Sequence, residues 1–68
     1  MQARKRVGVN IQRLRREREL SQEELGARAK VHQTYLSQVE SAKRNPSVDV
    51  LERIADALKV DITELFKR

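Results

Sequence analysis

The 68-residue chain is long enough for one small domain, because a chain of this length buries only about 60% of the surface that its unfolded form exposes. It contains no cysteine and one histidine, which excludes disulfides, thiolate zinc sites and cysteine nucleophiles and argues against any metal site. No apolar run approaches the roughly 18 to 20 residues of a membrane span, and the N-terminus lacks the apolar segment of a signal peptide. We therefore expect one cytoplasmic domain over residues 1–68, with no cofactor.

The positive charge is concentrated at the N-terminal end. Fifteen basic and ten acidic residues give a net charge of +5, and residues 1–18 hold seven of the basic residues and one of the acidic ones. A protein that is basic at one end suits polyanions, with nucleic acid as the first candidate and anionic lipid as the second. A solvated helix face with a frayed basic tail would give the same charge distribution.

The hydrophobic pattern predicts an all-α chain, since no window of four to eight residues alternates apolar with polar side chains as a strand would. Val7, Ile11 and Leu14 lie at helical spacing and predict a first helix over about residues 7–18. Arginines occupy its other faces. We expect this helix to bury one apolar stripe.

A capping box predicts the start of the second helix near Gln22. In the S-x-x-E run, the Ser21 hydroxyl and the Glu24 carboxylate satisfy exposed amide donors reciprocally. Gly26 lies inside this helix, where glycine costs about 1 kcal/mol relative to alanine, so we expect another backbone to pack closely there. After a break of about three residues, a third short helix is predicted over about 33–40.

The C-terminal part predicts two further helices. Residues 41–46 form a loop, and Ser47 caps a fourth helix. Its apolar residues follow the i, i+3, i+4, i+7 pattern without a miss: Leu51, Ile54, Ala55 and Leu58. Asp61 to Glu64 resembles a second capping box and predicts a last short helix over about 62–67. The prediction is therefore five helices.

The second and third helices follow the helix-turn-helix plan, in which the second of the two enters the major groove of DNA. The residues SQEELGARAKVHQTYLSQVESAKRNPS, followed by LERIADALKV, resemble the Cro/repressor (XRE-type) helix-turn-helix family of phage and bacterial regulators. The resemblance covers about residues 7–66. It implies a compact five-helix, lambda-repressor-like bundle and a sequence-specific regulator of transcription that binds double-stranded DNA.

The chain departs from the family pattern at four turns, where glycine is common in the family. The residues found there instead are Glu19, Lys30, Ala42 and Lys59. A residue with a side chain costs roughly 1–2 kcal/mol in a left-handed conformation. We therefore expect turns that are either differently shaped or mildly strained.

The third helix places its polar residues on one face, at 100° per residue. Glutamine can contact adenine in a bidentate manner, and threonine or serine can bond several bases, which makes this face suitable for base reading. The resemblance implies that it holds the family's base-reading positions. The predicted base-reading residues are Gln33, Thr34, Ser37 and Gln38.

Contacts to DNA phosphates are expected from basic, hydroxyl and amide side chains around this helix. The resemblance places them at the start of the second helix, with Gln22, and in the loop after the third, with Ser41, Lys43, Arg44 and Asn45. Tyr35, within the third helix, could donate its hydroxyl to a phosphate. Tyr35 could equally cover the edge of the core. The basic residues within 1–6 form either a flexible arm against DNA or a disordered start.

The resemblance also implies an ion pair between Arg15 and Glu40 that ties the first helix to the end of the third. His32 occupies a capping position, so that a cap or a neutral surface residue is favoured over a ligand role. The apolar C-terminal residues Ile62, Leu65 and Phe66 either pair two protomers or close the core of one.

We expect a homodimer that binds a palindromic or pseudopalindromic operator. An antitoxin or a restriction–modification controller of the same fold is the alternative within this class. A protein-interaction module that does not read DNA is the alternative from another class. An enzyme is not expected, because the chain lacks cysteine and a pair of inward-facing carboxylates for acid–base chemistry. No small-molecule ligand or membrane contact is expected.

Overall fold

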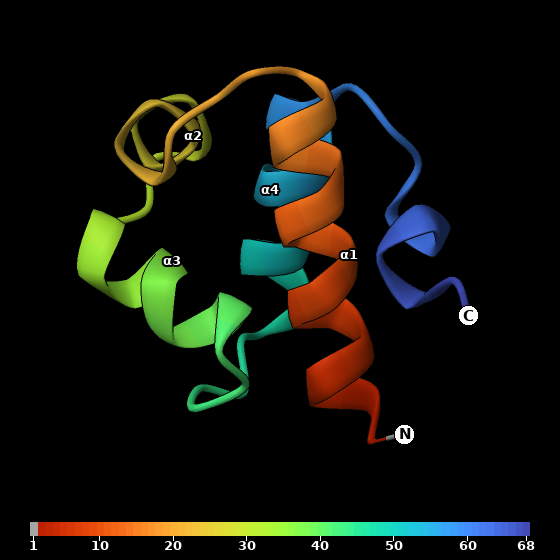
Figure 1. Ribbon diagram of the computed structural model, residues 1–68. Helices are drawn as coiled ribbons and strands as arrows, with labels where there is room; N and C mark the ends of the chain where they lie inside the picture. Colours follow the sequence, from red (N-terminus) through yellow and green to blue (C-terminus); the bar gives the residue numbers. More distant parts are fainter. Residues whose placement is uncertain (1) are drawn as a thin grey trace.

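The computed structural model describes residues 2–68 and is helical throughout its regular structure (Figure 1). Four α-helices are followed by one 3-10 helix, and the part of the chain described contains no strand. The elements are α1 (Ala3–Glu17), α2 (Gln22–Ala29), α3 (Gln33–Glu40), α4 (Val48–Leu58) and the 3-10 helix η1 (Ile62–Phe66). The all-α prediction is confirmed, whereas the prediction of five helices of one kind is corrected to four α-helices and a 3-10 helix.

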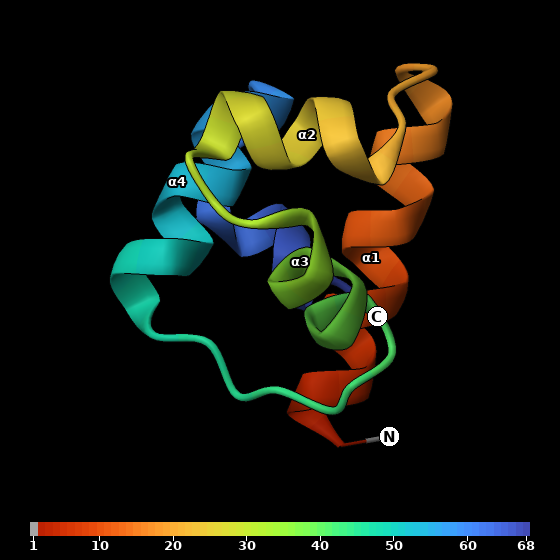
Figure 2. The ribbon, with the colours of Figure 1, turned by 90° about the vertical axis from the view of Figure 1, so that its left-hand side faces the viewer.

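Helix α1 packs mainly against α3 and η1. In Figure 1, α2 and α3 lie on one side of it and η1 lies on the other, with α4 behind. After a turn of 90°, α3 faces the viewer, and the loop that follows it runs past the start of α1 (Figure 2). The helix-turn-helix pair therefore occupies one side of the molecule and the C-terminal element the opposite side.

The first helix begins at Ala3, four residues earlier than its apolar stripe predicts. Residues 3–6 contain neither glycine nor proline, and they extend the helix although the positive charges of Arg4, Lys5 and Arg6 are unfavourable at a helix N-terminus. The expectation of a flexible or disordered basic start is therefore corrected for residues 3–6. Residue 1 lies outside the described residues. Within the helix, Val7, Ile11 and Leu14 are buried as predicted.

The predicted capping box of α2 is confirmed. The Glu24 N–H donates to the Ser21 hydroxyl at 3.0 Å, and the Ser21 N–H donates to the Glu24 carboxylate at 2.8 Å. Hydrogen bonds from Ser21, first through its backbone and then through its side chain, lower the pKa of Glu24. Ser47 caps α4 as predicted, since its hydroxyl accepts from the Val50 N–H at 3.2 Å.

The predicted capping box at Asp61 does not form. The Glu64 N–H bonds the Asp61 carbonyl at 2.9 Å, an i to i+3 bond that tightens the turn into the 3-10 form. Asp61 instead accepts from the Thr63 N–H at 2.9 Å, which lowers the pKa of Asp61. The Glu64 carboxylate bonds the Lys67 ammonium at 3.2 Å. With five residues, the element is too short to gain much from α-helical bonding.

Each of the four α-helices is followed, within two residues of its end, by a left-handed residue that is not glycine. At the end of α3, the Ala42 N–H bonds the Val39 carbonyl at 3.1 Å and the Lys43 N–H bonds the Gln38 carbonyl at 2.8 Å, which is the Schellman pattern. The four residues and their φ values are Glu19 (53°), Lys30 (58°), Ala42 (64°) and Lys59 (60°). The turns thus keep the shape that glycine would favour and are mildly strained.

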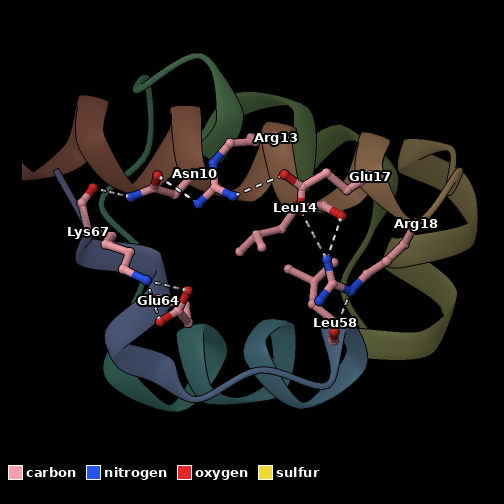
Figure 3. A network of polar contacts seen from close by, with 8 residues as sticks. All are labelled: Asn10, Arg13, Leu14, Glu17, Arg18, Leu58, Glu64 and Lys67. Carbon is pink, nitrogen blue, oxygen red and sulfur yellow. Dashed lines mark hydrogen bonds and ion pairs between the residues drawn. The ribbon is translucent and has the colours of Figure 1, made fainter.

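Two polar side chains, Asn10 of α1 and Arg18 directly after its end, join this helix to the C-terminal part of the chain (Figure 3). The amide of the buried Asn10 donates to the carbonyls of Leu65 at 2.9 Å and Lys67 at 2.7 Å. The Arg18 Nε donates to the carbonyl of Leu58 at 2.7 Å, at the end of α4. These bonds satisfy carbonyls at helix ends, which lack partners within their own helices.

Candidate nucleic-acid interface

Helix α3 has one buried face and one exposed polar face. Leu36 and Val39 are fully buried in the core. Gln33 and Thr34 are exposed, and Ser37 and Gln38 are half-buried beside them. The structure therefore brings the four predicted base-reading residues together on the side of α3 that faces away from the bundle. Their chemistry, two amides and two hydroxyls, can donate to and accept from base edges.

His32 forms the N-cap of α3. Its Nδ1 accepts a hydrogen bond from the Thr34 N–H at 3.2 Å. This contact satisfies one of the amide donors at the start of the helix. Of the two roles that the sequence left open, a cap or a neutral surface residue, the structure shows the cap, and α3 begins at the next residue, Gln33.

Two glycines set how closely α3 approaches its neighbours. A Cβ on Gly26 would lie 2.6 Å from the Val31 carbonyl oxygen, in the turn between α2 and α3, so the predicted close packing is confirmed. A Cβ on Gly8 would lie 2.5 Å from the backbone carbonyl oxygen of Glu40, at the end of α3. Sequence reasoning missed Gly8, although a glycine inside a predicted helix is the same signal that identified Gly26.

A hydrogen-bonded carboxylate locks the end of α3 to α1 and α2. The Glu40 carboxylate accepts from Arg15 Nε at 2.8 Å and from Arg15 Nη2 at 3.0 Å, and from Gln22 Nε2 at 3.1 Å. Arg15 also donates to the Leu20 carbonyl at 2.9 Å. The Glu40 side chain is only 3% exposed, so its charge depends on these donors. The implied ion pair of Arg15 and Glu40 thus exists in the structure as a bidentate contact.

Gln22, one of the predicted phosphate-contacting residues, already makes a contact within the protein. It is half-buried at the start of α2, and one of its amide hydrogens is used by Glu40. The other amide hydrogen has no protein partner among residues 2–68. Gln22 can therefore link a phosphate to the same carboxylate that fixes α3.

The loop after α3 carries most of the other predicted phosphate-contacting residues. Lys43, Arg44 and Asn45 are exposed, and the Ser41 hydroxyl donates to the Gln38 carbonyl at 3.2 Å. Tyr35 is half-buried and packs against the core. The start of α1 lies beside this loop, since Ala3, Arg4, Asn45 and Pro46 line one small cavity of about 80 Å³. The basic first turn of α1 thus adds to the charge around the loop.

The three predicted interface residues of the C-terminal part have different surroundings. Leu65 is fully buried within the chain, so the expectation that it contributes to a dimer surface is corrected. Ile62 is half-buried against the core, and Phe66 is 42% exposed. Leu65 is buried because η1 packs between α1 and α4. Of the three predicted interface residues, Phe66 and part of Ile62 therefore remain available at the surface.

No group of three or more His, Cys, Asp or Glu side chains within residues 2–68 is placed to hold a metal ion. Over the same residues, no helix is both long enough and apolar enough to cross a membrane.

Comparison with known proteins gives a family and several similar chains. The family model described as Helix-turn-helix matches residues 11–65. The uncharacterized HTH-type transcriptional regulator y4dJ of Sinorhizobium fredii is 51% identical over 65 residues, which are 96% of this chain and 84% of that protein. The control protein C.MunI of a Mycoplasma species is 40% identical over 90% of this chain and 84% of its own length.

The solved structures include a close structural match. The restriction-modification controller protein C.AhdI from Aeromonas hydrophila superposes with a TM-score of 0.90 and is 32% identical. The match covers 93% of this chain and 96% of that one. The correspondence therefore extends over the helix-turn-helix pair and the C-terminal elements together.

Proposed function

The chain belongs to the helix-turn-helix family of DNA-binding transcriptional regulators, and on that basis we propose that it reads the major groove with α3 and binds a twofold-symmetric operator as a homodimer. The proposal has three parts. Side chains of α3 read bases, residues around α3 contact phosphates, and the C-terminal part joins two protomers.

The exposed face of α3 is the observation that carries the base-reading part. Gln33 and Thr34, in its first turn, are exposed, while Leu36 and Val39 anchor the opposite face in the core. In helix-turn-helix proteins, the N-terminal residues of the second helix contact base edges. Gln33, Thr34, Ser37 and Gln38 are accordingly the proposed base-reading residues.

Contacts to phosphates are proposed for the residues that surround this face. They are Gln22, Tyr35, Ser41, Lys43, Arg44 and Asn45, with Arg4 and Lys5 of the first turn of α1 beside them. Such contacts position the protein on the duplex without reading its sequence. Because they displace counterions, binding should weaken strongly with salt. If about six phosphates are neutralised, the slope of log K against log salt should be near −5.

The dimer is proposed through the region of residues 48–68. Two large apolar side chains of this region are exposed: Val48 at 67% and Phe66 at 42%. Two protomers would present their α3 helices to half-sites one helical turn apart, roughly 34 Å. Phe66→Ala should weaken the association, and sedimentation at micromolar concentration measures it directly.

Selection of bound sequences from a random pool of duplex DNA tests the proposed function. The expected result is an enriched site with twofold symmetry. Gln33→Ala or Thr34→Ala should then cost about 1–3 kcal/mol of specific binding and leave binding to random duplex nearly intact. Lys43→Ala should weaken both. Equal losses on both duplexes for all three variants would show that α3 is not the reading helix, and no enrichment would refute DNA reading.

A restriction–modification controller is the second candidate, because C.AhdI carries that description and matches this chain over most of its length. The genomic position of the selected DNA site distinguishes such a controller from a regulator of other genes. If the site occurs in the genome of origin upstream of a restriction endonuclease gene, the controller role is supported. Any other location favours a different regulatory target.

A further inference from the structure

Arg44 folds back from the loop onto the surface of α3. Its Nε donates to the Gln38 Oε1 at 2.7 Å, and its guanidinium carbon lies 4.9 Å from the centre of the Tyr35 ring. Both contacts are made by one planar group, so they restrict its position together. The hydrogen bond is short because its donor is charged.

The charge of Arg44 is not neutralised by the protein. None of the ion pairs found within residues 2–68 includes it, and the residue is exposed. Its Nε is used by Gln38, while Nη1 and Nη2 have no protein partner among the described residues. Arg44 thus retains the two terminal donors that can bind two acceptors at once.

The bond from Arg44 also decides what Gln38 can offer to a base. A glutamine reads adenine by accepting from N6 through its oxygen and donating to N7 through its nitrogen. In this structure the Gln38 oxygen faces the Arg44 guanidinium, which leaves the amide nitrogen, a donor, as the available group. Gln38 and Arg44 together therefore offer mainly donors, because one of the two lone pairs of the Gln38 oxygen is already used by Arg44.

We infer that Gln38 and Arg44 form one reading unit that selects guanine, whose major-groove edge presents two acceptors, N7 and O6. This inference rests on the proposed placement of α3 in the major groove. Adenine and cytosine each place an amino donor on that edge, which would face the donors of the pair. Arg44, expected from the sequence to contact a phosphate, is on this view a residue that determines base specificity.

The test is selection from a random duplex pool with the full chain and three variants. The parent should show a guanine that is preferred over adenine by roughly 5- to 150-fold, the range of a good bidentate contact. In Arg44→Ala, the Gln38 oxygen is released, so the preference at that same position should shift toward adenine. In Gln38→Ala, the guanine preference there should fall by several-fold. The other positions of the site should stay unchanged in both variants.

Lys43→Ala is the matched control. It removes one positive charge from the adjacent exposed residue, whose side chain has no hydrogen bond or ion pair within residues 2–68. It should lower affinity for all sequences alike and leave every base preference as in the parent. Comparison with Arg44→Ala therefore separates a loss of charge from a loss of base reading.

Two results would overturn the inference. One is that Arg44→Ala lowers affinity uniformly, as Lys43→Ala does, which would make Arg44 a phosphate contact. The other is that the parent prefers adenine at the position affected by Gln38→Ala. In both cases an enriched site still exists, and the proposed function stands. A pool with no enriched sequence for the parent would refute the proposed function itself.

Discussion

On the side of α1 that faces α3, the backbone of Gly8 lies against the carbonyls of Val39 and Glu40, and the buried ion pair of Arg15 and Glu40 secures the contact. On the side that faces η1, two hydrogen bonds from the Asn10 amide to backbone carbonyls make the polar connection. The contact with α3 involves two nearly buried charges, each of which needs an opposite charge beside it. The contact with η1 uses neutral groups and leaves Phe66 exposed at the surface. The two sides of α1 are therefore held by different kinds of contact, and five predictions test this difference.

The largest effect is expected from Glu40→Ala. This variant leaves the guanidinium of Arg15, whose side chain is 11% exposed, without its carboxylate, and should cost about 3–5 kcal/mol of unfolding free energy. Urea denaturation measures the loss. The double variant Arg15→Met with Glu40→Met removes both charges and should recover most of it. A single variant as stable as the parent would show that the ion pair does not hold α3.

Gly8→Ala should destabilise the same side by about 1–3 kcal/mol. The new methyl group would lie 2.5 Å from the backbone oxygen of Glu40, which cannot move without shifting α3. Specific DNA binding should fall along with stability, because the reading helix is displaced. Gln12→Ala is the control on the same helix, and it should change neither quantity appreciably. If Gly8→Ala changed stability and DNA binding as little as Gln12→Ala does, α1 and α3 would not be held at this distance.

Asn10→Ala tests the opposite side. It leaves the carbonyls of Leu65 and Lys67 without their donor and should cost about 1–2 kcal/mol. Thermal unfolding gives the change in stability. Because α3 is not touched, the DNA sequence preference should remain that of the parent. A changed preference would show that the two sides of α1 are coupled.

Ala42→Gly should raise stability by about 0.5–1 kcal/mol. Ala42 has a φ of 64°, a conformation that costs a residue with a side chain more than it costs glycine. The opposite sign is expected for Ala27→Gly in the exposed part of α2, where glycine costs about 1 kcal/mol. If both variants were destabilised alike, the turn after α3 would not be strained.

The smallest effect is expected in the dependence of stability on acidic pH. Each side has one carboxylate with a lowered pKa, Glu24 at the start of α2 and Asp61 before η1. A group whose pKa is lower in the folded state contributes stability above its unfolded pKa, and that contribution is lost as the pH falls through the folded pKa. Stability should therefore decrease below about pH 4. Glu24→Gln and Asp61→Asn should each flatten this part of the pH profile, and an unchanged profile in both would contradict the assignment.

Much of the fold follows from local signals in the sequence. Ser21 and Ser47 mark helix starts because their hydroxyls satisfy amide donors a few residues ahead, and both caps form as predicted. The apolar spacing of α4 identifies its buried residues without knowledge of their partners. The range predicted for the third helix, 33–40, agrees with the structure. These features depend on residues within one or two helical turns of each other, so a sequence contains them in full.

Other features depend on which distant groups meet, and only the tertiary structure decides them. Asn10 can be buried because its amide donates to the carbonyls of Leu65 and Lys67, which are more than fifty residues away in the sequence. Leu65 belongs to the core and Phe66 to the surface because η1 is a tight 3-10 turn that presents one of them inward. The local pattern of two adjacent apolar residues cannot distinguish them.

The features of the proposed base-reading surface can be divided in the same way, into those that the sequence contains and those that the tertiary structure decides. Its residue types and their shared face on α3 were determined by the sequence, because 100° per residue places Gln33, Thr34, Ser37 and Gln38 together. The tertiary structure alone decided that Arg44 bonds Gln38 and that Glu40 is fixed by Arg15 and Gln22. These contacts join side chains from separate elements across the folded surface. Their geometry depends on how closely Gly8 and Gly26 let the backbones approach.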